Sequence, residues 1–350
     1  MTAAESNTDR KRTLKDFLGH LTRGENLSRQ EAGDFLDLLL DSQATDAQIA
    51  AALIALKLKG ETVEELAGLA AGMRLRAVRI NSNHSCFIDT AGTGSSRAKT
   101  FNVSTAAALV IAGAGLPVAK HGNRAASSRC GSADVLTALG VNVSPAPEIS
   151  EQCLNEIGIC FMFAPLYHGA TARVAGIRRQ LGVQTTFNLL GPLTNPARAP
   201  RQLIGVWDRS LIEPLAQTLS LIGTERAWIV HGEDGLDELT TSGQTFIAEA
   251  GPVTVRTFEV SPSDFGLERA ELDHLRGGEA EANAAIIREV ISGNRHDGAR
   301  TLVVLNAAAA LYVGGVSETM SDAAELAAKS IDSGAAAAKL DQLVERTNRT

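Results

Sequence analysis

Residues 87–128 combine glycines and hydrogen-bond donors in a pattern suited to binding phosphate groups. A short apolar run, Phe87-Ile88, leads into a turn with Gly92 and Gly94, and a hydroxyl-rich segment then opens a helix near Thr105. Glycine lets the backbone approach a ligand closely, and free amides at a helix start attract anions. A glycine turn alone is more often only a tight corner, so the neighbouring residues decide the interpretation.

A second polar run follows the next predicted strand, residues 117–119. It reads Lys120-His121-Gly122-Asn123-Arg124, and Ser127 and Ser128 come shortly after it. Carboxyl ends of parallel strands meet at one edge of a sheet, where open α/β sheets bind ligands. We therefore expect both polar runs to converge on one polyphosphate. They form neither known nucleotide fingerprint, because Arg97 replaces the third glycine of G-x-G-x-x-G and no P-loop Gly-Lys-Ser/Thr follows.

Two adjacent carboxylates, Asp237 and Glu238, follow the predicted strand 227–230 and a glycine-flanked turn. Such a pair in a loop is usually only solvated. Magnesium, however, is typically held by one or two carboxylates together with substrate phosphates. Beside a polyphosphate site, the pair predicts bound Mg²⁺.

Composition narrows the class of protein. The 350 residues include 40 acidic and 33 basic side chains, a net charge of −7, without the basic block expected of a nucleic-acid binder. The four cysteines show no C-x-x-C spacing, which argues against zinc and fits a reducing cytoplasm. No apolar run reaches the roughly 18 residues of a membrane span. We expect a cytoplasmic protein that binds neither nucleic acid nor membrane.

The pattern of elements predicts an α/β fold in two parts. Up to about residue 80 the signals are helical, with capping boxes at Ser28-x-x-Glu31, Thr45-x-x-Gln48 and Thr62-x-x-Glu65. From about residue 85 strands and helices alternate, which indicates a mostly parallel central sheet flanked by helices. The predicted strands are 87–88, 117–119, 160–163, 203–207, 227–230, 246–248 and 253–260. The predicted helices are 106–114, 133–139, 211–221, 282–291, 306–313 and 323–344.

Nine segments in order resemble the anthranilate phosphoribosyltransferase family, enzymes of tryptophan synthesis. The resemblance covers roughly residues 14–340, and its longest motifs are the most specific. The segments are Gly92-Thr93-Gly94, Thr100–Thr105, Lys120–Arg124, Ser127-Ser128, Gly131–Asp134, Phe163–His168, Arg178–Gly182, Phe187–Pro196 and Asp237-Glu238.

The resemblance implies a fold, a reaction and partners. Residues 1–80, completed by helices near 170–195, would form a small all-helical dimerisation domain, and residues 81–350 a large α/β domain. The enzyme, a pentosyltransferase, would transfer the 5-phosphoribosyl group from phosphoribosyl diphosphate (PRPP) to the amine of anthranilate. It would use Mg²⁺, two ions per subunit, and act as a homodimer.

The resemblance also implies site residues. Ser104, Asp237 and Glu238 would bind metal. No catalytic residue is certain, because positioning and stabilisation of the diphosphate are the main needs, but His121 and His168 are candidates for acid–base work. For the acceptor we expect Gly92, Asn123, His168, Arg178 and Pro192, with Arg178 gripping the carboxylate. For PRPP we expect Gly92, Ser95, Ser96, Thr100, Asn102, Val103, Ser104, Thr105, Lys120, His121, Gly122, Asn123, Arg124, Ala125, Ala126, Ser127, Ser128 and Ser132.

One departure and two alternatives stay open. Ser95-Ser96-Arg97 stands where most relatives have Gly-Asp-Gly, so the role of that aspartate does not carry over. The alternatives are an enzyme like pyrimidine nucleoside phosphorylase and a non-catalytic nucleic-acid-binding relative. Acceptor strictness, rates and a complex with the preceding pathway enzyme are not readable from the sequence.

Overall fold

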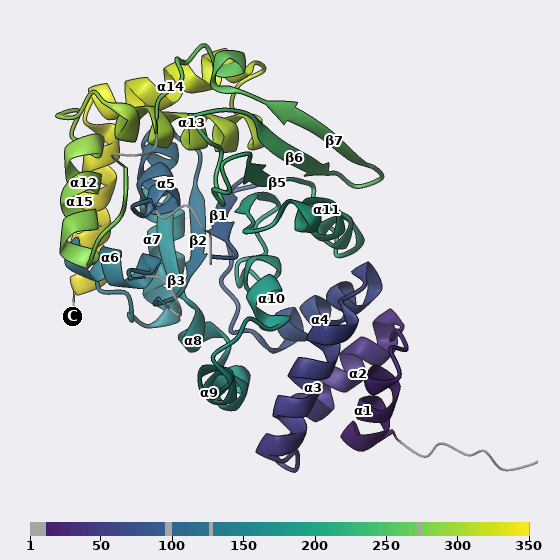
Figure 1. Ribbon diagram of the computed structural model, residues 1–350. Helices are drawn as coiled ribbons and strands as arrows, with labels where there is room; N and C mark the ends of the chain where they lie inside the picture. Colours follow the sequence, from purple (N-terminus) through teal and green to yellow (C-terminus); the bar gives the residue numbers. More distant parts are fainter. Residues whose placement is uncertain (1–11, 95–99, 126–128, 272–274, 350) are drawn as a thin grey trace, which may run out of the picture.

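The computed structural model describes residues 12–94, 100–125, 129–271 and 275–349, which form a helical bundle beside a sheet flanked by helices (Figure 1). The bundle, purple in Figure 1, contains α1 (Leu14–Thr22), α2 (Arg29–Leu40), α3 (Asp46–Lys59) and α4 (Val63–Arg76). Each of these helices begins at a capping box, including the three predicted from sequence and a fourth at Thr13. Such caps satisfy backbone amides that have no partner inside the helix.

The large domain is built on a seven-stranded sheet in the order β3-β2-β1-β4-β5-β6-β7. Strands β1 to β5 are parallel, and β6 and β7 continue the sheet antiparallel at one edge. The predicted mostly parallel sheet is therefore confirmed, and each of the seven strand signals corresponds to a strand. Their bounds are β1 (Ile88–Gly92), β2 (Val118–Gly122), β3 (Ile159–Phe163), β4 (Arg201–Gly205), β5 (Arg226–Gly232), β6 (Thr245–Ala250) and β7 (Val255–Val260).

Helices cover both faces of this sheet, and the C-terminal ones pack together at the side far from the bundle (Figure 1). They are α5 (Val103–Gly113), α6 (Ser132–Ala138), α7 (Pro147–Ile157), α8 (Ala164–Tyr167), α9 (Ala172–Leu181), α10 (Phe187–Leu193), α11 (Ile212–Leu221), α12 (Ala280–Ile291), α13 (Gly298–Val313), α14 (Met320–Asp332) and α15 (Ala335–Asn348). Short 3₁₀ turns lie at Gly169–Thr171, Arg209–Leu211 and Pro262–Phe265.

The structure refines two of the predicted helical stretches. The stretch 323–344 is largely helical, as expected, and it is divided into α14 and α15 because Gly334 takes a left-handed conformation with φ of 78° that turns the chain. The stretch 306–313 is the second half of α13, which begins at Gly298, where Asp297 caps it by accepting a hydrogen bond from the amide of Ala299.

One apolar core joins the bundle to the sheet. Leu36 and Leu53 of the bundle belong to the same buried cluster as Val174 and Ile177 of α9 and Ile229 of β5. Helix α10 adds further buried leucines to this cluster. The segment around residues 170–195 therefore packs with the bundle while staying attached to the sheet, and this places its polar residues between the two parts.

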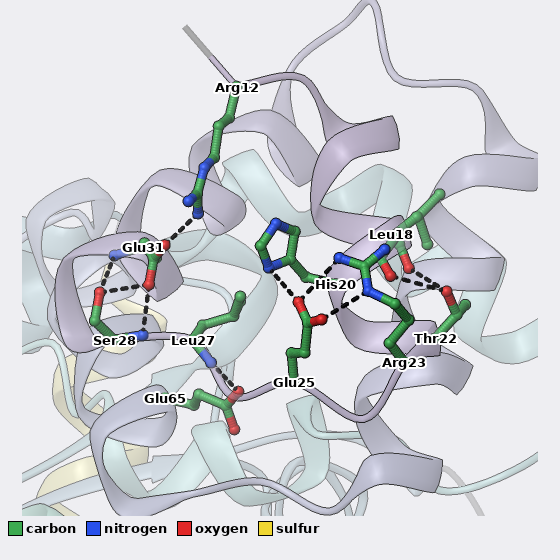
Figure 2. Close-up of polar contacts among 11 residues, drawn as sticks. Arg12, Leu18, His20, Thr22, Arg23, Glu25, Leu27, Ser28, Glu31 and Glu65 are labelled. Atoms are coloured by element: carbon green, nitrogen blue, oxygen red, sulfur yellow. Dashed lines mark hydrogen bonds and ion pairs between the residues drawn. The ribbon is translucent and has the colours of Figure 1, made fainter. Parts of the chain in front are cut away.

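Glu65 ties the bundle together from inside. Its side chain is fully buried and accepts hydrogen bonds from the amides of Leu27 and Thr62, each 2.8 Å long, and from the ammonium group of Lys59, also 2.8 Å. Figure 2 shows Glu65 reaching the amide of Leu27, and beside it a surface cluster in which Glu25 contacts His20 and Arg23. None of the helices in the described part of the chain is both long and apolar enough to span a membrane.

Replacing Glu65 with Ala should lower the free energy of unfolding by about 3–5 kcal/mol, because it leaves the buried ammonium of Lys59 without its partner. Urea denaturation measures the change. The matched control is Glu64→Ala, one position away on the exposed side of α4, which should change the free energy by less than about 0.5 kcal/mol. Equal losses in both variants would contradict this role of Glu65.

Candidate active site

The two polar runs do meet at the carboxyl edge of the sheet, and Lys120 joins them. This lysine lies in the middle of β2 as a buried side chain and donates hydrogen bonds to the carbonyl oxygen of Thr90, in the middle of β1, and to Ser104 Oγ, the latter 3.3 Å long. Ser104 lies in the first turn of α5. One ammonium group therefore fixes the relative positions of two strands and a helix start.

Buried carboxylates surround that ammonium. Burial lowers the pKa of Lys120, and the nearby carboxyl groups of Asp89 and Glu238 raise it again. Burial raises the pKa of Asp89 to about 6, and burial together with repulsion from Asp237 raises that of Glu238 to about 8. The carboxyl groups of Asp89 and Glu238 thus lie near one ammonium group, and Asp237 repels Glu238; a divalent cation would relieve this repulsion. This donor set fits Mg²⁺.

The loop that carries Asp237 and Glu238 is held from both sides. On one side, Asn306 of α13 accepts a hydrogen bond from the amide of Leu239 (2.9 Å) and donates to its carbonyl oxygen (3.0 Å). On the other, a Cβ atom at Gly205 would lie 1.6 Å from the carbonyl oxygen of Asp237, so only glycine permits this approach. The loop is clamped where its carboxylates begin.

Asp237 lies beside the predicted glycine turn. A Cβ atom at Gly92 would be 3.7 Å from a carboxylate oxygen of Asp237, and Gly92 pairs with Gly205 across β1 and β4. No group of three or more His, Cys, Asp or Glu side chains with metal-site geometry occurs in residues 12–94, 100–125, 129–271 and 275–349. The candidate metal site therefore consists of a carboxylate pair and Ser104, an arrangement that leaves coordination positions for substrate oxygens and water.

The start of α5 is suited to an anion. Asn102 precedes the helix without capping it, and its amide group instead donates to the carbonyl oxygen of Cys130 and accepts from Asn283. The amides of Val103 and Thr105 already donate to the carbonyl oxygens of Phe101 and Asn102, and that of Ser104 to Glu238, so α5 would attract an anion mainly through its dipole. Thr105 Oγ is buried without a hydrogen-bond partner among the described residues. Val103 in the same helical turn is buried, and Thr100, before the helix, is half-buried.

Arg124, expected among the PRPP-binding residues, has a partner within the protein. Its guanidinium group pairs with Asp134 of α6 at 2.9 Å and lies over the ring of Phe163. The carbonyl oxygen of Asn123 accepts a hydrogen bond from Ser132 Oγ, 3.3 Å long. Ser95, Ser96, Ala126, Ser127 and Ser128 lie outside the described residues, as does the substituted position Arg97.

Two histidines, His121 of β2 and His168 just after α8, lie together. The ring centroids of His121 and His168 are 5.2 Å apart, and His121 Nδ1 contacts the carbonyl oxygen of Gly191 at 3.2 Å. Burial is the main cause that lowers the pKa of His121 to about 3 and that of His168 to about 4. Both imidazoles are therefore neutral at physiological pH and weak as bases.

Arg178, the residue expected to bind the carboxylate of the acceptor, lies on α9. Its Nη2 donates a 3.0 Å hydrogen bond to Asn188 Oδ1, and its guanidinium group lies 5.6 Å from the ring centre of Phe187. Pro192, expected in the acceptor site, is buried in α10, where its carbonyl oxygen accepts a hydrogen bond from Gln202. Sequence analysis missed Asn188, Asp89 and Asn306, because the local pattern does not show which groups their side chains contact.

The helical bundle, the sheet and the phosphate-binding edge define a two-domain glycosyl transferase. Residues 15–77 match the helical bundle domain of a glycosyl transferase family, and residues 84–337 match its α/β domain. The chain is 51% identical over 331 residues to the anthranilate phosphoribosyltransferase of Moorella thermoacetica, which covers 95% of this chain and 97% of that one. The relative from Rhodopseudomonas palustris is 48% identical over 335 residues. The chain belongs to the anthranilate phosphoribosyltransferase family.

Solved structures agree with this assignment. The anthranilate phosphoribosyltransferase of Thermus thermophilus superposes with a TM-score of 0.89 at 38% identity, covering 95% of this chain and 99% of that one. The enzyme of Saccharomyces cerevisiae in complex with PRPP and Mg superposes with a TM-score of 0.86 at 27% identity, covering 95% and 97%. The predicted family and fold are confirmed.

The low pKa values of His121 and His168 can be tested by NMR. The imidazole signals of His121 and His168 should show no titration between pH 8 and 5 in NMR spectra, whereas a histidine peptide titrates near 6.5. The pKa values in the folded state lie below the unfolded value, so protonation of these histidines favours the unfolded state. Their effect on the free energy of unfolding is therefore absent above pH ~6.5, and the protein loses stability as the pH falls toward the folded pKa values of about 4 for His168 and about 3 for His121. A midpoint near 6.5 for either ring would contradict their burial.

Proposed function

We propose that the protein transfers the 5-phosphoribosyl group of PRPP to the amine of anthranilate, giving N-(5-phosphoribosyl)anthranilate and diphosphate for tryptophan synthesis. The supporting observation is the meeting of Lys120, Ser104 and Glu238 at the carboxyl edge of the sheet. The 51% identity over nearly the whole chain favours this reaction over that of a pyrimidine nucleoside phosphorylase. The net charge of −7 argues against a nucleic-acid-binding relative.

PRPP would lie along the start of α5 and the end of β2. The positive end of the α5 dipole would favour phosphate oxygens there, and Lys120 would supply one point charge. Binding phosphate would require Lys120 to exchange its contact with the Thr90 carbonyl for a ligand oxygen, which is favourable for a buried ammonium. Arg124, paired with Asp134, contributes mainly to the shape of the loop.

Magnesium would be held by Asp237, Glu238 and Ser104, and we propose two ions per subunit. When bound, the metal neutralises the charge that develops on the leaving diphosphate. The carboxylates orient it, and the clamp formed by Asn306 and Gly205 keeps them in place. The yeast relative was solved with PRPP and Mg, which supports this assignment.

Anthranilate would lie between the two domains, with its carboxylate on Arg178 and its ring near His168, Pro192 and Gly92. An aromatic amine has a lone pair that needs no strong base, so neutral histidines suffice to orient it. Asn123 would contact the amine from the donor side. The yeast relative has also been solved in complex with 4-fluoroanthranilate.

We also propose a homodimer formed by the helical domain, residues 1–80 with the helices near 170–195. Leu58 of α3 and Leu75 of α4 expose 81% and 77% of their surface, which is apolar area that a second subunit could cover. A cytoplasmic location is proposed on the absence of disulfides, since the four cysteines are free thiols.

The loss of anthranilate fluorescence after addition of PRPP and Mg²⁺ tests the reaction directly. Replacing Asp237 with Asn and Glu238 with Gln should lower turnover by orders of magnitude, because the leaving group loses its metal, while the melting temperature stays close to that of the wild type. The control is Glu233→Gln, an exposed carboxylate of the same loop. Near-normal turnover of the double variant at saturating Mg²⁺ would remove the pair from the site.

A further inference from the structure

The guanidinium group of Arg178 is held by an amide. Asn188 Oδ1 accepts a 3.0 Å hydrogen bond from Arg178 Nη2 and a second, also 3.0 Å, from the backbone amide of Thr185. The amide of Asn188 itself donates to the Thr185 carbonyl oxygen at 2.8 Å. Because Asn188 lies in the first turn of α10 and closes on the residues just before it, its side chain has one fixed orientation.

Nothing in the described surroundings of Arg178 cancels its charge. Burial alone lowers its pKa, with no carboxyl group opposing that effect, and it belongs to none of the ion pairs among the described residues. Its Nε is buried without a hydrogen-bond partner there, and the ring of Phe187 covers one side of the group. A half-buried guanidinium group whose Nε is buried and unpartnered would be stabilised by an anion that completes its hydrogen bonds.

We propose that Asn188 is a positioning residue that orients Arg178 while leaving its positive charge for the carboxylate of the substrate. The proposal rests on the proposed function and deepens it. It states that the pair Arg178–Asn188 lets the protein distinguish an aromatic amine that has a carboxylate from an analogue without the charge. A carboxylate at position 188 would hold the same guanidinium nitrogen, but it would also compete with the substrate for that charge.

The experiment compares anthranilate with anthranilamide, which has the same ring and amine but an uncharged carboxamide. Dissociation constants of both are measured, by fluorescence titration or competition, for wild type, Arg178→Ala, Asn188→Asp and Asn188→Ala. Arg178→Ala sets the full effect on anthranilate, about 10- to 150-fold weaker binding for a lost charged hydrogen bond. The Michaelis constant for PRPP serves as the control on the donor side of the site.

Asn188→Asp should weaken anthranilate about tenfold or more, within the range of Arg178→Ala, and change anthranilamide and PRPP by less than about twofold. Asn188→Ala should weaken anthranilate less than Asn188→Asp does, because the charge remains and only its orientation is lost. Unchanged anthranilate binding in Asn188→Asp, or equal weakening of both ligands, would overturn the proposal.

Two controls keep these outcomes separate. If Asn188→Asp does not fold, the comparison falls to Asn188→Ala, in which equal weakening of anthranilate and anthranilamide overturns the proposal and selective weakening of anthranilate supports it. A wild-type protein that transfers no phosphoribosyl group to anthranilate would refute the proposed function itself. A wild type that does so, with Asn188→Asp indistinguishable from it, would refute only the positioning role.

Discussion

The buried ammonium group of Lys120 is the interaction on which the candidate site depends. An ammonium in a protein interior is stable only with partners, and here it contacts Thr90 and Ser104 and faces the carboxyl groups of Asp89 and Glu238. These groups come from β1, β2, α5 and the loop after β5, so satisfying one charge fixes four segments. The carboxyl groups outnumber the ammonium, and this imbalance makes the same place suitable for a divalent cation and a polyphosphate.

The part of the site proposed to bind PRPP (the donor side) and the part proposed to bind anthranilate (the acceptor side) differ in their charged groups. On the donor side, charges are close together and partly cancel, so a highly charged ligand and its metal can replace internal contacts. On the acceptor side, the histidines are neutral, and the guanidinium group of Arg178 is held by the neutral amide of Asn188. A weakly charged aromatic ligand would thus meet a positive group where its carboxylate would lie. His121 lies on β2 next to Lys120, so the two sides meet at the sheet, whereas Arg178 and Asn188 lie on α9 and α10, which pack with the bundle.

The features that sequence could predict are those carried by local patterns. Capping boxes, the alternation of strands and helices, the glycine turn and the run from Lys120 to Arg124 gave the fold and the meeting of the two polar runs at the sheet, because each depends on neighbouring residues. Asp89 and Asn306 could not be found in this way, since their partners lie in other elements, and Asn188 gains its meaning from its contact with Arg178 ten residues earlier. The break at Ser333-Gly334 and the pairing of Arg124 with Asp134 do have local signals, a turn dipeptide and a nearby helix start.

The central claim is that a carboxylate pair beside a buried lysine binds the metal of the leaving diphosphate. A crystal of the protein with PRPP and with Mn²⁺ in place of Mg²⁺ tests this most directly, because anomalous scattering locates the ion. The account predicts an anomalous peak at coordination distance, roughly 2.0–2.3 Å, from a carboxylate oxygen of Asp237 or Glu238 and from an oxygen of the diphosphate. A peak held only by PRPP and water, with both carboxylates turned away, would contradict it.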